Sequence, residues 1–242
     1  MKRSILHMIY AISVFGIISQ MAVSCAKTGT YSSNNSPSVS YVTFMNLAPY
    51  GDSTSIYFNG SAYPTTYPVT AYSSTYFSLA SGNYDVQFKT STASDSLLAE
   101  IPASPFDSLG TYTLILYNDT AHGKVKAAKI TDDFSNVTVS NTYYRFFNMA
   151  TDMPSLDLYI NNVKVQSNRT VADNIQNTLY NSFLPISNGY VSIQVKQAGT
   201  TTAVGNTLTG TLNLGQPYTI FLEEAQDSSG ITYSLAILAA SL

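Results

Sequence analysis

Cysteine, histidine and tryptophan are almost absent from this chain of 242 residues. It has one cysteine, two histidines and no tryptophan. A single cysteine excludes an intramolecular disulfide, so packing alone must hold the fold together. Histidine is the commonest general acid or base near neutral pH, and its scarcity argues against a Ser-His-Asp hydrolase.

Charged side chains are scarce as well. Asp, Glu, Lys and Arg make up 10% of the sequence, and the formal net charge at pH 7 is −3. Binding to nucleic acid needs clustered Lys and Arg, which this composition does not offer. Solubility must rest on hydroxyl and amide groups, and the 19 tyrosines favour strands over helices.

The N-terminus carries the one segment with the pattern of a targeting signal. Lys2 and Arg3 precede a mostly apolar segment, residues 5–18, which leads through small residues to Cys25. This pattern indicates a secretory signal peptide over residues 1–24. Polar residues interrupt the apolar segment, which makes it a poor membrane-spanning helix, because a span takes about 20 apolar residues.

The sequence around Cys25 resembles the lipobox of bacterial lipoproteins, in which the cysteine is acylated and becomes the mature N-terminus. Such sequences commonly have Leu three residues before the cysteine, where this chain has Ala22. An ordinary cleavage site that leaves a free thiol therefore stays open as the alternative. We expect a lipid on Cys25, a membrane as partner, and a flexible tether over residues 25–40.

The rest of the chain contains one pattern twice. Residues 42–48 align with residues 144–150, and residues 82–89 align with residues 189–196. Apolar and polar side chains alternate within both copies, as in strands with one buried face. We predict an all-β fold of two tandem antiparallel β-sandwich domains, immunoglobulin-like or transthyretin-like, each with its own core and without a long helix.

The expected domain limits follow from the repeat. The first sandwich should cover residues 41–135 and the second residues 140–242. Residues 137–139 are an open alternative for the end of the last strand of the first copy.

Four motifs in this order resemble the domain-of-unknown-function family 4397. They are Phe44-Met45-Asn46-Leu47-Ala48-Pro49, Ile56-Tyr57-Phe58-Asn59-Gly60, Leu79-Ala80-Ser81-Gly82-Asn83-Tyr84-Asp85-Val86 and Leu109-Gly110-Thr111-Tyr112-Thr113. The resemblance covers most of residues 41–238. It implies tandem β-sandwich domains on exported proteins, frequently lipoproteins of the Bacteroidota phylum, and it implies no activity.

The sequence offers no catalytic, cofactor or metal motif. His122 is the single histidine after the signal peptide, and the glycine beside it places it in a turn. The pairs Asp132-Asp133 and Glu223-Glu224 are poor metal ligands, because neighbouring side chains on a strand point to opposite faces. We therefore expect no enzyme, no cofactor and no metal, with a hydrolase as the least favoured function.

Tyrosine is the one abundant residue that can recognise a partner. An exposed row of rings would stack on sugars or anchor a protein, and the candidates are Tyr50, Tyr57, Tyr63, Tyr67 and Tyr72. The alternative is that these are ordinary, half-buried strand residues. A second candidate is the segment 166–181, which is longer than its counterpart in the first copy and is a candidate binding loop.

Four tripeptides in the first copy resemble the Asp-Ser/Thr-x sequon for O-glycosylation of the same phylum. Their hydroxyl residues are Ser53, Ser96, Ser108 and Thr120. Each lies at an expected strand end, where a glycan would fit on the surface.

These features favour a non-enzymatic lipoprotein of the cell envelope, on either face of the outer membrane, that acts in binding, adhesion or scaffolding. The alternative is a carbohydrate-binding accessory protein of a surface glycan-uptake system. An extracellular glycan or protein is the expected partner, and nucleic acid is not.

Overall fold

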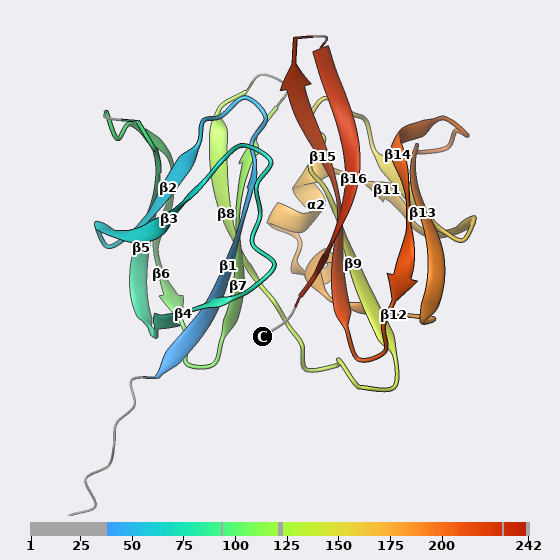
Figure 1. Ribbon diagram of the computed structural model, residues 1–242, viewed down its shortest axis with the longest axis horizontal. Coiled ribbons are helices and arrows are strands. Elements are labelled where there is room, and N and C mark those ends of the chain that lie inside the picture. Colours follow the sequence, from blue (N-terminus) through green and yellow to red (C-terminus); the bar gives the residue numbers. More distant parts are fainter. Residues whose placement is uncertain (1–37, 93, 121–122, 229, 241–242) are drawn as a thin grey trace, which may run out of the picture. The chain divides into compact units, whose positions relative to one another are not determined.

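Strands carry nearly all of the regular structure in a computed structural model that describes residues 38–92, 94–120, 123–228 and 230–240. Cys25, His122, the signal segment and most of the expected tether lie outside the described residues. No helix in the described part of the chain is long and apolar enough to cross a membrane. Residues 37–242 form one compact unit, in which two halves repeat the same order of strands (Figure 1).

The first half contains eight strands. They are β1 (Val39–Leu47), β2 (Thr54–Phe58), β3 (Ser61–Tyr67), β4 (Phe77–Ala80), β5 (Gly82–Thr90), β6 (Leu97–Phe106), β7 (Thr111–Asn118) and β8 (Val125–Thr131). One sheet has the order β4-β1-β7-β8 and the other has the order β3-β2-β5-β6.

The second half repeats this arrangement and adds a helical segment. Its elements are β9 (Thr142–Asn148), β10 (Leu156–Ile160), β11 (Val163–Arg169), α2 (Val171–Gln176), the 3-10 helix η1 (Thr178–Asn181), β12 (Leu184–Ile186), β13 (Gly189–Gln197), β14 (Ala203–Leu212), β15 (Pro217–Asp227) and β16 (Gly230–Ala239). Its sheets have the orders β12-β9-β15-β16 and β11-β10-β13-β14. The predicted all-β pair of sandwiches is therefore confirmed.

Each half contains one parallel pair of strands that the antiparallel prediction did not include. Strand β1 pairs in parallel with β7, and β9 pairs in parallel with β15. The other strand pairs are antiparallel. The first strand of each half therefore lies beside a strand that comes about 70 residues later in the chain.

Each sandwich encloses its own apolar core, as the alternation in the sequence predicts. Phe44, Val86 and Phe88 are buried in the first core, and Phe146, Ile193 and Val195 in the second. A Leu buried in a core is worth about 1.5–3 kcal/mol relative to an exposed one, so these clusters supply much of the stability of each half.

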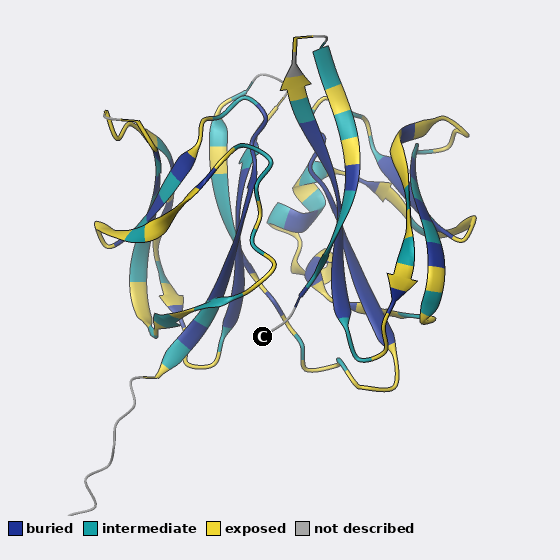
Figure 2. Cartoon of the chain, in the orientation of Figure 1, coloured by how far each residue is buried: buried dark blue, intermediate teal, exposed yellow. Residues whose placement is uncertain are grey.

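A third apolar cluster lies between the two halves. It contains Met45, Leu47, Ile115 and Ile130 from the first half, and Phe147, Met149 and Phe221 from the second. The central strands β7 and β9 are therefore buried on both faces (Figure 2), which explains the continuous apolar run Leu114-Ile115-Leu116 of β7. This shared cluster was not predicted from the repeat, in which each copy has a core of its own.

The linker between the halves differs from one expectation. Strand β8 ends at Thr131, and residues 137–139 lie in no strand, so the idea that they finish the last strand of the first copy is wrong. The linker instead turns back so that the Thr138 N–H donates to the Tyr143 hydroxyl at 3.1 Å.

Candidate functional site

The segment between β11 and β12 distinguishes the second half from the first. In the first half, the corresponding residues 68–76 contain no helix, whereas residues 170–183 contain α2 and η1. The start of α2 is fixed by Asp173, whose carboxylate accepts the Thr170 N–H at 2.8 Å. This segment includes most of the candidate binding loop, residues 166–181, and we call residues 170–184 the α2–η1 loop.

Arg169 anchors the α2–η1 loop through its guanidinium group. Its guanidinium is buried and donates to Asp173 at 3.2 Å, to Asn174 Oδ1 at 2.9 Å and to Gln166 Oε1. The same guanidinium lies over the ring of Tyr180, 4.1 Å from the ring centre. Burial lowers the pKa of Arg169 while the Asp173 carboxylate opposes that shift, so the group keeps its charge and its donors.

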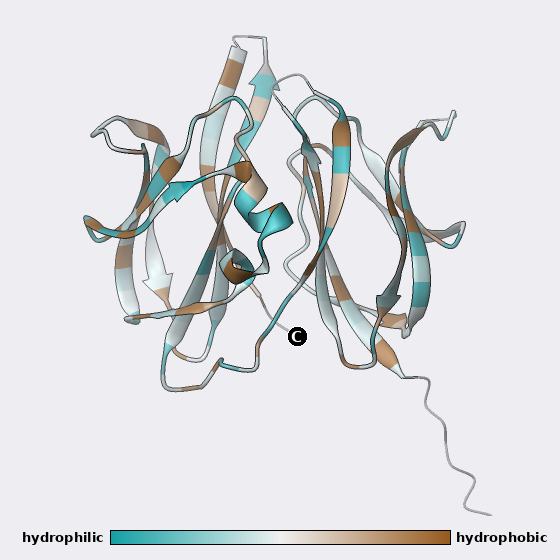
Figure 3. Cartoon of the chain, turned by 180° about the vertical axis from the view of Figure 1, so that it is seen from behind, coloured by the Kyte–Doolittle hydropathy of each residue, from teal (hydrophilic) through white to brown (hydrophobic). Residues whose placement is uncertain are grey.

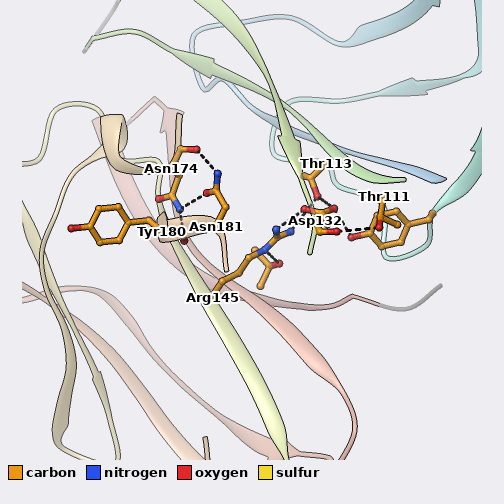
Figure 4. A network of polar contacts seen from close by, with 9 residues as sticks. Thr111, Thr113, Asp132, Arg145, Asn174, Tyr180 and Asn181 are labelled. Atoms are coloured by element: carbon orange, nitrogen blue, oxygen red, sulfur yellow. Dashed lines mark hydrogen bonds and ion pairs between the residues drawn. The ribbon is translucent and has the colours of Figure 1, made fainter. Parts of the chain in front are cut away.

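Two asparagines close the loop on itself. Asn174 Nδ2 donates to Asn181 Oδ1 at 3.2 Å, and Asn181 Nδ2 donates to the Asn174 carbonyl at 3.1 Å (Figure 4). Both side chains are buried. Paired amides of this kind fix the backbone between them, so the loop is a rigid platform.

The loop is also joined to the contact between the halves. Phe183 stacks on Phe134 of the linker, with ring centres 5.1 Å apart, and lies 4.6 Å from the guanidinium carbon of Arg145. Arg145 in turn donates to Asp132, with Nη1 2.5 Å from Oδ1, and both side chains are buried (Figure 4). Thr113 and Tyr76 donate to the other Asp132 oxygen at 2.6 and 2.7 Å.

Two hollows are lined in part by residues of the α2–η1 loop. One has a volume of about 410 Å³ and is lined by Val165, Gln166, Ser167, Arg169, Asn177, Leu179, Tyr180, Ser182 and Leu184. The other has a volume of about 350 Å³ and is lined by Lys129, Ile130, Thr131 and Asp133 of the first half and by Asn174, Ile175, Thr178, Asn181 and Ser182. Such volumes suit a small ligand, and both walls mix apolar groups with amides and hydroxyls.

Three large apolar side chains are exposed at the rim of the first hollow. Leu179, Tyr180 and Leu184 are 75%, 39% and 42% exposed. In Figure 3, hydrophilic and hydrophobic colours alternate along the helical segment of the second half. Exposed apolar groups on a rigid platform are typical of a recognition surface.

The five candidate tyrosines do not form an exposed row. Tyr67 is buried in the first core, which contradicts its expected role in ligand contact, because its ring packs edge-on against Phe44. Tyr63 stacks on Phe77, with ring centres 4.1 Å apart.

The remaining candidates lie at three separate places. The Tyr57 hydroxyl donates to Asp95 at 3.2 Å, and Tyr50 lies in the turn after β1, where its N–H donates to Asn118. Tyr72 packs edge-on against Phe221 at the contact between the halves. The structure therefore favours the alternative, in which tyrosines are half-buried residues of the sandwich.

The neighbouring carboxylates of Glu223 and Glu224 lie in different surroundings. Glu224 is buried and accepts the Thr151 N–H at 2.9 Å and the Thr151 hydroxyl at 3.0 Å. Glu223 points to the other face, and its buried Oε2 has no hydrogen-bond partner among the described residues. Burial raises the pKa of Glu223 to about 7. Among the described residues, no group of three or more His, Cys, Asp and Glu is placed to hold a metal ion.

The four candidate glycosylation residues are exposed. Ser53 and Ser96 directly precede β2 and β6, Ser108 lies in the turn between β6 and β7, and Thr120 follows β7. Their placement at strand ends is as predicted, and their modification stays a prediction.

Sequence reasoning missed Arg145, Asp132 and Arg169 as site-forming residues. Arg145 carried a signal, because it interrupts an apolar strand and aligns with Thr43 in the first copy. Arg169 ends β11 without such a sign, because exposed arginines are common at strand ends.

Residues 40–159 match the model of a protein family described as Domain of unknown function (DUF4397). The match covers the first half and extends into β10 of the second. A comparison with curated proteins found no match.

Proposed function

We propose that this chain is a non-enzymatic binding module of the cell envelope, held at the outer membrane by a lipid on Cys25. The observation that carries the binding role is the α2–η1 loop, which Arg169 and the Asn174–Asn181 pair fix in place beside two hollows. A site whose shape exists before the ligand arrives loses little conformational entropy on binding.

A carbohydrate is the ligand class that suits the larger hollow best. Tyr180 presents part of its ring to solvent at the rim, and sugars stack their apolar faces on such rings. Gln166, Asn177 and Ser182 line the same hollow and can exchange hydrogen bonds with sugar hydroxyls. A protein that binds through the same loop is the second candidate, supported by the exposed Leu179 and Leu184.

The experiment is a binding screen of the purified full chain in detergent against a panel of soluble glycans, followed by titration calorimetry. We expect Tyr180→Ala to weaken binding about tenfold, because an aromatic contact of this kind is worth about 1 kcal/mol or more. Tyr190→Ala is the control, because Tyr190 is 70% exposed and lines neither hollow. Equal affinity of the Tyr180→Ala variant and the unchanged chain would reject this site.

Which face of the membrane the module occupies is a separate question. A low charge and a surface rich in hydroxyls suit contact with external polymers, so we favour the outward face. Protease treatment of intact cells tests this preference: cleavage supports it, and protection until lysis leaves a periplasmic scaffold.

A further inference from the structure

Three turns at one end of the molecule carry exposed apolar side chains. Leu109 lies in the turn between β6 and β7, Leu214 in the turn between β14 and β15, and Val139 in the linker between the halves; they are 74%, 54% and 85% exposed. Figure 1 shows all three segments at the lower end of the molecule, the turn of Leu109 under the first half and the other two under the second. Exposed apolar side chains that gather at one end of a molecule mark a surface for contact with a partner or a membrane.

The repeat places Leu109 and Leu214 at equivalent positions in the two halves. The turn of Leu109 lies beside the start of β1, where the Leu109 N–H donates to the Val39 carbonyl at 2.7 Å. The turn of Leu214 lies beside the start of β9, where the Gly215 N–H donates to the Asn141 carbonyl at 2.8 Å. Both halves therefore present a leucine next to the point where the chain enters the sandwich.

The N-terminal part of the chain joins the folded unit at this same end. The described chain begins at Ser38, and β1 begins at Val39. Residues 25–38 lie between Cys25 and β1, and a chain of that length reaches at most about 50 Å even when fully extended. A lipid on Cys25 would therefore keep this end of the molecule within reach of the bilayer.

The charge of the three segments suits a neutral lipid surface. Residues 134–141 and 213–216 contain no charged residue, and the segment 107–110 contains only Asp107. The Asp107 carboxylate accepts the Tyr112 hydroxyl at 3.2 Å. Bringing this end to the headgroups thus requires little desolvation of charge.

We infer that Leu109, Val139 and Leu214 form a docking surface that inserts into the headgroup region of the membrane and sets the orientation of the two sandwiches. The inference rests on the proposed lipid anchor at Cys25. In this orientation the end of β6 at Phe106 lies near the bilayer. The start of β6 at Leu97 lies at the opposite end of the strand, away from the lipid.

The single cysteine of the chain makes a direct test practical. Once Cys25 is acylated, an introduced cysteine is the only free thiol for an environment-sensitive fluorophore. The lipid-modified full chain carrying Leu109→Cys, Leu214→Cys or Leu97→Cys is labelled and reconstituted into vesicles of phosphatidylethanolamine and phosphatidylcholine. Leu97 is the matched control, because it is 54% exposed, as Leu214 is, and lies at the far end of β6 from the Leu109 turn.

We expect lipids with a nitroxide near the headgroup to quench the labels at positions 109 and 214 and to leave the label at 97 bright. Leu214→Ser should lower the ratio of docked to free protein, read from the label at position 109, about tenfold. Burial of a leucine side chain favours the docked state by about that factor or more. Vesicle flotation separates the two proposals. A chain that fails to float overturns the anchor and the docking surface together.

Two further results overturn the docking surface alone. One is a chain that floats and shows equal quenching at positions 109, 214 and 97. The other is emission at position 109 that changes with protein density on the vesicle and not with nitroxide lipid, because that result assigns the surface to a second copy of the chain.

Discussion

Arg145 of the second half and Asp132, which follows the last strand of the first half, form a buried ion pair with Nη1 2.5 Å from Oδ1. Both side chains are almost fully withdrawn from solvent. Removing one partner of such a pair leaves an uncompensated charge in a region of low dielectric.

We therefore expect Arg145→Ala to lower the free energy of unfolding by about 3–5 kcal/mol. Urea unfolding followed by circular dichroism measures the effect. Lys126→Ala is the control, because Lys126 is an exposed residue of β8 and its removal should cost less than about 0.5 kcal/mol. A decrease in the free energy of unfolding for Arg145→Ala as small as that of the control would show that the ion pair does not stabilise the contact between the halves.

Substitution of the equivalent core residues Phe88 and Val195 by alanine should lower the free energy of unfolding by different amounts. Both are at most 1% exposed, one in each core. We expect Phe88→Ala to cost about 3–5 kcal/mol and Val195→Ala less, because the cavity left by a phenyl ring is larger. Thermal unfolding of both variants checks the order. A Val195→Ala chain less stable than the Phe88→Ala chain would contradict it.

We predict that each half folds alone, although separation exposes the shared apolar cluster to water. Separated halves would expose Phe147, Met149 and Phe221 on the second half and Met45 and Ile115 on the first. We expect residues 41–135 and 140–242, expressed separately, each to melt cooperatively but at a lower temperature than the intact chain. The failure of both halves to melt cooperatively would show that the two sandwiches are one folding unit.

Glu223 should make the stability depend on pH. Burial raises the pKa of Glu223 from 4.5 to about 7, so the folded state prefers the protonated acid. Stability from this group is fully present below about pH 4.5 and is lost as the pH rises through 7, a loss of at most about 3 kcal/mol.

Glu223→Gln should therefore unfold at higher urea concentration than the unchanged chain at pH 8 and at a similar concentration at pH 4. Denaturation midpoints of both chains across this range measure the difference. Glu224 is also buried, with its pKa raised by burial, so Glu224→Gln serves as the comparison for a carboxyl that has hydrogen-bond partners in Thr151. A constant difference between the Glu223→Gln and unchanged chains at all pH values would contradict the assignment to Glu223.

Cys25 is expected to take a lipid. Cells fed a clickable fatty acid should label the unchanged chain and not the Cys25→Ser variant, because the acyl chains are attached through this residue. Labelling that survives in Cys25→Ser would place the lipid on another residue, and no label in either chain would leave an ordinary secreted protein.

The strands were predictable because their pattern is local. Alternation around Val86 and Phe88 shows which face is buried, whatever the neighbouring strand is. The pairing of Arg145 with Asp132 was not, because it depends on how two halves with separate cores meet. Tyr67 illustrates the same limit, since no local feature separates a core tyrosine from the half-buried Tyr63 four strand positions before it.

The functional loop was partly predictable. Its extra length relative to the first copy is visible in the sequence and marks residues 166–181 as a candidate. The residues that fix it are not, because the donors of Arg169 reach three acceptors that are brought together only when α2 forms.

The parallel pairing of β1 with β7, and of β9 with β15, determines when each half can become complete during synthesis. A chain emerges N-terminus first, so β1 has to wait without its central neighbour until residues 111–118 have appeared. Strand β9 waits in the same way for residues 217–227, close to the end of the sequence. Such distant pairing makes assembly slow, and during this interval only the short strand β12 can pair with β9. An apolar strand that waits in this way is open to aggregation until the last strands of its half arrive.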